Sequence, residues 1–162
     1  MEQVLEVPAQ RLVATCSFYA VPLITTLSVK FPVLDNVDRE HWDFIVTVAG
    51  VFIATSRLEQ LGLTDKQKTS LLEIIVNDLQ EWKSDGLRAI DNCKTLFERE
   101  FDELTARGHE ERYTGSDALG MWIIVNVLGH GPQNKEEVRL LRTVGAMVTA
   151  TFFDYWSRVA QT

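Results

Sequence analysis

The sequence predicts an all-α protein, a compact bundle of five to six helices with one long central helix. Apolar residues recur at spacings of three and four along most of the chain, which is the period of an amphipathic helix. Strand-like alternation is nearly absent, and helix-capping residues and glycines stand at the ends of the periodic segments. A length of 162 residues suits one core, so we expect residues 1–162 to form a single helical domain.

The first helix is expected over residues 9–30. Pro22 falls inside it, and because its ring clashes with the preceding turn, we expect a kink or a restart there. Pro32 follows the helix and disfavours helical backbone in the residue before it. Residues 31–36 are therefore interpreted as a loop.

The second helix is expected to start after Asp38 as N-cap and to run to Leu61, with Gly62 as its stop. Thr64 and Gln67 have the spacing of a capping box, in which each side chain bonds to the other residue's backbone N–H. A third helix should therefore begin directly after this pair.

The segment from residue 65 to about residue 106 is predicted to be one long, nearly straight helix. Its apolar residues step by three, four and four, close to the pitch of a straight helix. Residues 84–86 are poor helix formers, so the alternative is a break into two helices there. Continuity is favoured because the stripe keeps its phase across the glycine. The stripe consists of Leu79, Trp82, Gly86, Ile90, Cys93, Phe97, Phe101 and Leu104.

The remaining third of the chain is predicted to contain a polar loop and two helices. The loop covers residues 108–115 and includes His109 and Glu110, and Ser116 can cap a short apolar helix over residues 117–128. A turn follows at residues 129–132. The pair Asn134 and Glu137 resembles a cap and opens a final helix, which is expected to end near residue 159.

The second and last helices are expected to be apolar around most of their circumference and therefore buried on all sides. Small residues recur four apart in both helices, which allows close helix contacts; the pairs are Gly50 with Ala54 and Ala146 with Ala150. A chain this short can hardly bury so much apolar helix surface by itself. We therefore expect a homodimer that buries at least one of these small-residue patches.

The charge balance bears on the partners. Lys+Arg 16 against Asp+Glu 23 gives a net charge of -7, which disfavours nucleic acid because phosphate backbones attract basic faces. The same sign disfavours docking on anionic lipid. Cys16 and Cys93 are far apart and in no metal-ligand spacing, so we interpret both as small apolar residues in a reducing compartment. The acidic start of the sequence lacks the positive region of a secretory signal, so a cytoplasmic protein is expected.

Membrane insertion has one candidate segment. Residues 12–29 carry no charge and approach the length that spans a bilayer. Pro22 interrupts this stretch, and it also contains Thr15, Ser17, Thr25, Thr26 and Ser28. We therefore expect a buried core helix rather than a membrane span.

Trp122, Asn126 and His130 form the first candidate ligand site. They step four apart, so they share a face if the helix extends through Gly129. In the functional interpretation, Asn126 and His130 orient a polar ligand atom at a pocket edge. In the structural interpretation, which we favour, Asn126 satisfies a backbone carbonyl and His130 caps the helix C-terminus.

Two carboxylate sets lie on the long segment and were considered for acid–base chemistry or for binding a hard cation. Both lie off the apolar stripe, so we expect solvated acidic faces, with attraction of a basic protein as the alternative use. The sets are Asp91, Glu98 and Asp102, and Asp78, Glu81 and Asp85. We expect no metal site and no cofactor.

Three polar residues, Thr47, Thr149 and Asp154, lie inside apolar segments. Asp154 stands among aromatic residues, where a raised pKa would suit a general acid; pairing with Arg158 is the favoured alternative. Tyr19, Trp42 and Trp82 are interpreted as core or groove aromatics.

No nucleotide-binding loop, nucleophile elbow or zinc-protease motif occurs in the sequence. The leading function is therefore a non-enzymatic acidic protein that acts through protein–protein interaction, as an adaptor, regulator or inhibitor. The alternative is a binder of an apolar small molecule in a pocket between helices, with or without chemistry at His130, Asn126 or Asp154. A closed cavity with convergent polar groups would favour the ligand binder, and a filled core with a surface patch would favour the adaptor.

Overall fold

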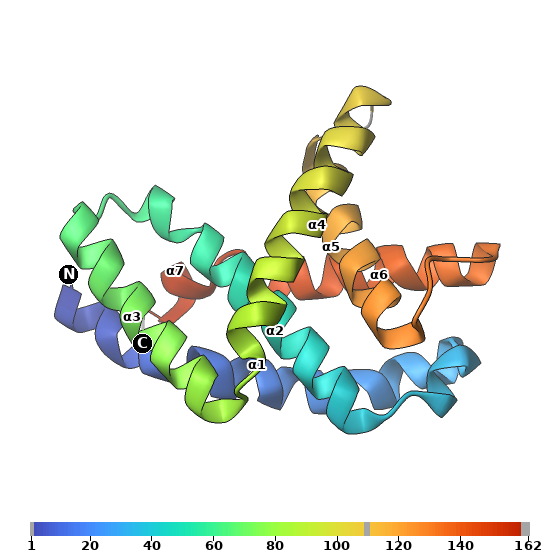
Figure 1. Ribbon diagram of the computed structural model, residues 1–162, viewed down its shortest axis with the longest axis horizontal. Helices are drawn as coiled ribbons and strands as arrows, with labels where there is room; N and C mark the ends of the chain where they lie inside the picture. The colour runs from blue at the N-terminus through green and yellow to red at the C-terminus, as the bar shows by residue number, and fades with distance from the viewer. Residues whose placement is uncertain (1, 109–110, 160–162) are drawn as a thin grey trace.

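A computed structural model describes residues 2–108 and 111–159 of the chain. These residues form helices and turns without a strand, so the all-α prediction is confirmed (Figure 1). The bundle has six helices of 18 residues or more and a short seventh. Their bounds are α1 Glu2–Lys30, α2 Arg39–Ser56, α3 Asp65–Trp82, α4 Gly86–Ala106, α5 Glu111–Leu128, α6 Lys135–Phe152 and α7 Tyr155–Val159.

Helix α2 is the centre of the bundle and packs against α1, α4, α5 and α6. Helix α1 lies at one edge, where it packs on α2, α3 and α7. Helices α4 and α5 pair along their length and project from the bundle as an arm, on the side away from α1 (Figure 1). α6 crosses α5 at the root of this arm and completes the core.

Three of the five predicted helix starts are confirmed by their hydrogen bonds, whereas Ser116, the expected cap of the helix over residues 117–128, lies inside α5. The Asp38 side chain accepts from the backbone N–H of Glu40 and caps α2. Thr64 and Gln67 form both bonds of the capping box at the start of α3. The Asn134 side chain accepts from a backbone N–H two residues into α6, at 2.9 Å. Each cap satisfies a donor that a helix end otherwise leaves unpaired.

The prediction of one long central helix is wrong. The segment breaks at residues 83–85, where Lys83 is extended, and α4 begins at Gly86. The stripe keeps its phase because each helix presents its own apolar face to the core, with Leu79 buried in α3 and Cys93 in α4. The poor helix formers at residues 84–86 allow the break, so the two helices pack in different directions. Helix α3 packs on α1, whereas α4 packs on α5 and α2. The longest helix is instead α1, with 29 residues.

The predicted boundaries of the first two helices also need correction. α1 begins at Glu2 and continues through Pro8 and Pro22 as one helix, without the restart that Pro22 suggested. The expected loop after it is largely a 3-10 helix, Pro32–Asn36. α2 ends at Ser56, and a further 3-10 turn, Leu58–Leu61, leads to Gly62, whose φ of 68° ends the segment as expected.

The boundaries of the last three helices differ as well. α5 begins at Glu111, so half of the expected polar loop is helical, whereas His109 and Glu110 lie outside the described residues. The last predicted helix is interrupted after Phe152, and α7 is a separate five-residue helix. α6 is amphipathic rather than apolar all round, since Arg139 and Arg142 are exposed opposite its buried residues.

The two small-residue patches differ in burial. A Cβ on Gly50 would lie 2.8 Å from Cys16 Sγ and 3.0 Å from the Phe152 ring, so this patch is closed by α1 and α6 of the same chain. Ala146 and Ala150 are exposed. The closest helix crossing, α5 on α6, instead uses glycines that the sequence analysis did not single out. At Gly120 and Gly145 a Cβ would collide with the backbone of the facing helix.

Candidate functional site

The structure does not bring Trp122, Asn126 and His130 to one site. Trp122 is buried, and its indole Nε1 donates to Asn92 Oδ1 on α4 at 2.8 Å. The Asn126 amide nitrogen donates to the carbonyl of Trp122 in its own helix, also at 2.8 Å. Helix α5 ends at Leu128, so His130 lies beyond it and donates from Nδ1 to the Gly131 carbonyl at 2.7 Å. These hydrogen bonds match the structural interpretation of Asn126.

A shallow pocket of about 540 Å³ lies beside His130, between the start of α2 and the end of α5. His41 also lines it, and its Nε2 donates to the Asn126 backbone carbonyl at 2.8 Å. His130 Nδ1 lies 3.8 Å from a carboxylate oxygen of the buried Glu137. Trp122 and the Asn126 side chain do not line this pocket. Its histidines therefore hold α2, α5 and α6 together rather than converging on a ligand position.

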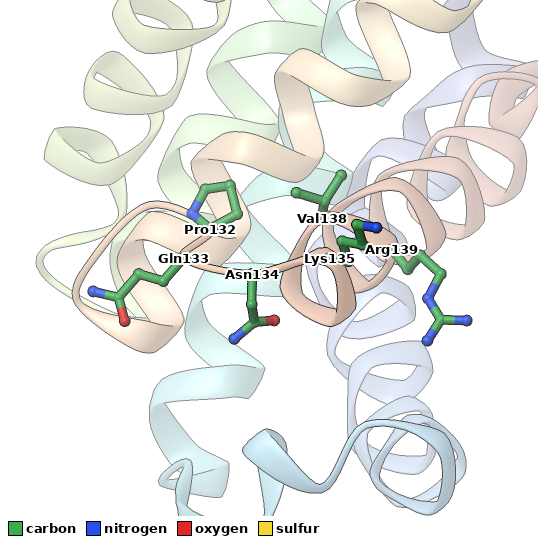
Figure 2. Close-up of a pocket in the computed structure, with 6 residues that line it drawn as sticks. All are labelled: Pro132, Gln133, Asn134, Lys135, Val138 and Arg139. Atoms are coloured by element: carbon green, nitrogen blue, oxygen red, sulfur yellow. The ribbon is translucent and has the colours of Figure 1, made fainter.

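A second hollow lies over the turn that precedes α6 (Figure 2). Its side chains diverge: Gln133 and Arg139 point in opposite directions, and neither faces a shared centre. Asn134 is occupied by the helix cap, since its amide nitrogen donates to Glu137 Oε2 at 2.9 Å. This hollow is the outside of a turn and lacks the convergent polar groups of a binding site.

A third hollow, with a mostly apolar lining, is a groove of about 900 Å³ at the root of the arm, between α2, α4, α5 and α6. Two of the polar residues singled out in the sequence, Thr149 and Asp154, line it together, and the exposed Ala146 and Ala150 form part of its floor. Its aromatic walls come from Phe97, Phe101 and Phe153. We call this hollow the arm groove.

The polar groups of the arm groove are incompletely paired. The Thr149 hydroxyl is buried and has no hydrogen-bond partner among the described residues. The Arg57 guanidinium lies 3.8 Å above the Phe153 ring and makes no ion pair within the described ranges. Asp154 is exposed, and the expected ion pair with Arg158 is not formed. By contrast, Thr47 donates to Asp43 Oδ1 at 3.1 Å and is fully satisfied in the core.

The carboxylate sets do not form a metal site. Asp91, Glu98 and Asp102 are exposed on α4, as their position off the stripe predicts. Asp78 is half-buried, and this desolvation, followed by the neighbouring charge of Glu81, raises its pKa. Within the part of the chain that the structure describes, no three His, Cys, Asp or Glu side chains come together as metal ligands.

The two cysteines are buried and unpaired with each other. Burial raises the pKa of both thiols far above the usual range, because an apolar environment disfavours the thiolate. The thiolate is the nucleophilic form, so neither residue is poised for nucleophilic catalysis. They act as small core residues, as the sequence suggested.

The outer face of α1 is the feature that the sequence analysis missed. Four valines and a phenylalanine of this helix are exposed although its inner face is buried, and Phe18 is 85% and Val29 83% exposed. α1 and the α2 segment, Val4–Lys30 and Arg39–Leu61, are both long and apolar enough to cross a membrane by length and composition. The exposed apolar residues of α1 are Val4, Val7, Phe18, Val21 and Val29, which we call the outer stripe.

Comparison with known proteins gives no family: no family model, no curated protein and no solved structure matches the chain. Function is therefore inferred from the surfaces of the chain itself. Two of them differ from an ordinary soluble surface, namely the outer stripe of α1 and the arm groove.

Proposed function

We propose that the protein is a non-enzymatic adaptor, regulator or inhibitor that acts through protein–protein interaction, with the outer stripe of α1 as its contact surface. The observation that carries this proposal is the exposure of Phe18, Val21 and Val29 on one helix face. Contiguous apolar surface of this kind on a soluble protein typically marks an interaction site. Burying it against a partner removes apolar area from water, at about 25 cal/mol per Å².

The state of the core supports the same proposal. The candidate chemical residues are engaged in structural bonds: Trp122 with Asn92, Asn126 with its own helix, and His41 with the α5 backbone. Both thiols are buried. The hollows described above are open to solvent rather than enclosed. A filled core beneath an apolar surface stripe is what an interaction protein requires.

The charge distribution narrows the kind of partner. The net charge of -7 disfavours nucleic acid and anionic lipid surfaces. Between Val7 and Val29 the outer stripe is interrupted by one charged side chain, Arg11. The partner surface is therefore apolar as well. The buried, unpaired cysteines suit a reducing compartment, so we propose a cytoplasmic location.

The test compares Phe18→Lys with the matched control Val138→Lys, which places the same charge on the surface of α6. Each variant replaces the wild-type chain in its own cells, and partners are captured by chemical crosslinking before lysis. We expect Phe18→Lys to lose a specific crosslinked species that wild type and Val138→Lys retain. Equal crosslinking of all three proteins would remove the outer stripe from consideration as the contact surface.

A second candidate function is the binding of an apolar small molecule in the arm groove. The buried, unpartnered Thr149 hydroxyl favours this function. Buried hydroxyls are normally hydrogen-bonded, and a bound molecule would supply the missing partner. Arg57, without an ion pair at the groove wall, suits a ligand with a carboxylate. Of the residues considered for chemistry, Asp154 lines this groove, whereas Asn126 and His130 do not.

The ligand candidate is tested by melting-temperature shifts with fatty acids and aromatic carboxylates. Wild type should gain stability with the logarithm of ligand concentration above Kd, whereas Thr149→Val and Arg57→Gln should lose this gain while keeping their own fold. Thr47→Val, which changes a satisfied core threonine, is the control for the substitution itself. A panel without any shift in wild type would leave the arm groove as plain surface.

A further inference from the structure

The outer stripe of α1 is not a random scatter of apolar residues, because it follows a coiled-coil repeat. From Val4 the outward positions advance by alternating steps of three and four, which gives the 3.5-residue period of a helix seam. All of these positions are exposed or half-buried, and the inner face of the same helix is buried in the core. The positions are Val4, Val7, Arg11, Ala14, Phe18, Val21, Thr25 and Ser28, with Val29 beside the last.

We propose that a second copy of this chain covers the outer stripe, with the two α1 helices packed antiparallel along their whole length. The proposal rests on the proposed function and names its partner. α1 has 29 residues and is therefore about 44 Å long, which makes it the longest available seam in the bundle.

The stripe pairs a large with a small side chain at its centre, while Val21 faces the partner's Arg11, when the two helices are centred on residue 16. This residue is the midpoint of Glu2–Lys30, so the two helices then overlap completely. In this register Phe18 faces the partner's Ala14, and Ala14 faces the partner's Phe18 in return. A large side chain meets a small one twice, as a two-fold interface requires and as knobs-into-holes packing favours. The antiparallel arrangement also places opposite ends of the helix dipoles together.

The surface area of the chain fits a missing partner. The chain exposes 9200 Å², whereas a folded monomer of 18.4 kDa exposes about 8200 Å² by the usual scaling. The excess of about 1000 Å² is close to the roughly 800 Å² that each partner contributes to a standard interface. The projecting α4–α5 arm adds to this surface (Figure 1), and the outer face of α1 contributes exposed apolar side chains.

The charge of the stripe favours a like surface over a charged partner. Apart from Arg11, its positions carry no charge, so an acidic or a basic protein gains little from it. A membrane surface with anionic lipids repels a chain of charge -7. A second copy also carries a net charge of -7, but its stripe is mostly apolar, so burial of apolar area can drive the association.

The first experiment measures the mass of the purified chain by analytical ultracentrifugation over a range of concentrations. We expect a monomer–dimer equilibrium for wild type and for the control Val138→Lys. Phe18→Lys should weaken association at least tenfold, and Ala14→Leu should weaken it by filling the space that the partner's Phe18 occupies. A wild-type monomer at all concentrations, or a dimer that Phe18→Lys leaves intact, would overturn the proposal.

The second experiment tests the antiparallel register with single-cysteine substitutions on the outer stripe. Residues 4 and 29 of one helix are about 38 Å apart, but residue 29 lies beside residue 4 of the other copy in the antiparallel pair. Oxidising a mixture of Val4→Cys and Val29→Cys should therefore give a crosslinked dimer, and Val4→Cys alone should not. Crosslinking of Val4→Cys with itself would show a parallel pair. Oxidised wild type is the control, since Cys16 and Cys93 are buried.

The failure of this inference can be distinguished from the failure of the proposed function. A monomeric chain with a Phe18-dependent partner of different mass in cells would overturn self-association and keep the interaction function. A monomeric chain without such a partner would defeat both. Phe18-dependent sedimentation with phosphatidylcholine vesicles, in a chain that stays monomeric without lipid, would also defeat both, because the stripe would then be a membrane-binding surface.

Discussion

Helices α1 and α2 have nearly the same apolar character but are used differently. Both contain a window that could span a membrane by composition, yet 39% of that window is buried in α1 and 56% in the α2 segment. α2 is surrounded by four helices and uses its whole circumference for packing. α1 lies at the edge, with neighbours on one side only, so its second apolar face stays in solvent.

This difference shows that the apolar content of a helix predicts how much of its surface favours burial, but not which neighbour buries it. The sequence analysis expected the second helix to be buried on all sides, which holds for most of α2. It expected residues 12–29 to form a buried core helix, but only one face of α1 is buried. The outer face of α1 is left exposed by the chain itself. The following predictions test this contrast, in order of decreasing effect on stability.

The largest effect is expected for Trp42→Ala in α2. The Trp42 ring is fully buried, and its Nε1 donates to the Ala20 carbonyl of α1 at 2.8 Å. Removing it leaves a cavity and takes away one hydrogen bond to the Ala20 carbonyl, so the free energy of unfolding should fall by about 3–5 kcal/mol. Urea unfolding followed by circular dichroism measures this loss. A loss below about 1 kcal/mol would mean that α2 is less buried than the contrast requires.

The next largest effect is expected at Gly86, the first residue of α4 after the break that ends α3. Helix α3 packs on the inner face of α1. A Cβ at Gly86 would lie 2.7 Å from Cγ of the fully buried Leu79. Gly86→Leu should therefore cost about 1–3 kcal/mol by overpacking, and Gly86→Ala should destabilise by less. Gly131→Ala is the control, because its Cβ meets nothing within 4 Å. An unchanged denaturation midpoint for Gly86→Leu would contradict the break.

A smaller effect is expected for Tyr155→Phe, which tests how the inner face of α1 is anchored. The Tyr155 hydroxyl donates to the Pro8 carbonyl at 2.6 Å, so its loss should cost about 0.5–1.5 kcal/mol at neutral pH. Burial raises the pKa of Tyr155 from 10.0 to about 12, which means that the fold favours the neutral phenol. Its contribution is complete below pH 10 and declines as the pH rises towards 12.

The measurement for Tyr155 is the difference in unfolding free energy between wild type and Tyr155→Phe as a function of pH. This difference should shrink between pH 10 and about 12. Taking the difference removes the contribution of Cys93, whose burial raises its pKa in the same direction and which both proteins contain. Cys16 is not removed in this way, because it also raises the pKa of Tyr155. A difference that stays constant over this interval would show that the phenol is not buried against α1.

The smallest effect is expected for Phe18→Ala on the outer stripe. Because the ring is 85% exposed, its removal should change the stability of the monomer by no more than about 0.5 kcal/mol. The melting temperature at low protein concentration, where association is absent, measures this change. A loss comparable to that of Trp42→Ala would place the ring inside the fold and abolish the contrast between the two helices.

The helix ends show where local sequence is sufficient. Asp38, Thr64 with Gln67, and Asn134 cap their helices as predicted, because a cap depends on residues within one turn of each other. The long central helix failed for the opposite reason. Its apolar phase is the same for one helix as for two that face one core, so the pattern cannot distinguish them, and the poor helix formers before Gly86 were underweighted.

The candidate site shows the same limit. Asn126 was interpreted correctly as a structural amide, because a lone amide in an apolar helix usually bonds to backbone. Its expected companion His130 lies beyond the end of α5, since the chain turns at Gly129 with a φ of 79°. Thr149 and Asp154 do meet, in the arm groove, but α4, which supplies two of its aromatic walls, turns towards them only because the long segment breaks.

The sequence by itself determined the helical class, the three capped helix starts at Asp38, Thr64 and Asn134, and the acidic, apolar-rich character of the chain, because periodicity, caps and composition act over one or two turns. Only the tertiary structure decided which apolar faces meet each other. It closed the Gly50 patch between α1 and α6, crossed α5 on α6 at Gly120 and Gly145, and left the outer stripe of α1 uncovered. The physical reason is that the burial of a side chain depends on the residues packed around it. When those residues are distant in sequence, no local sequence pattern reveals them.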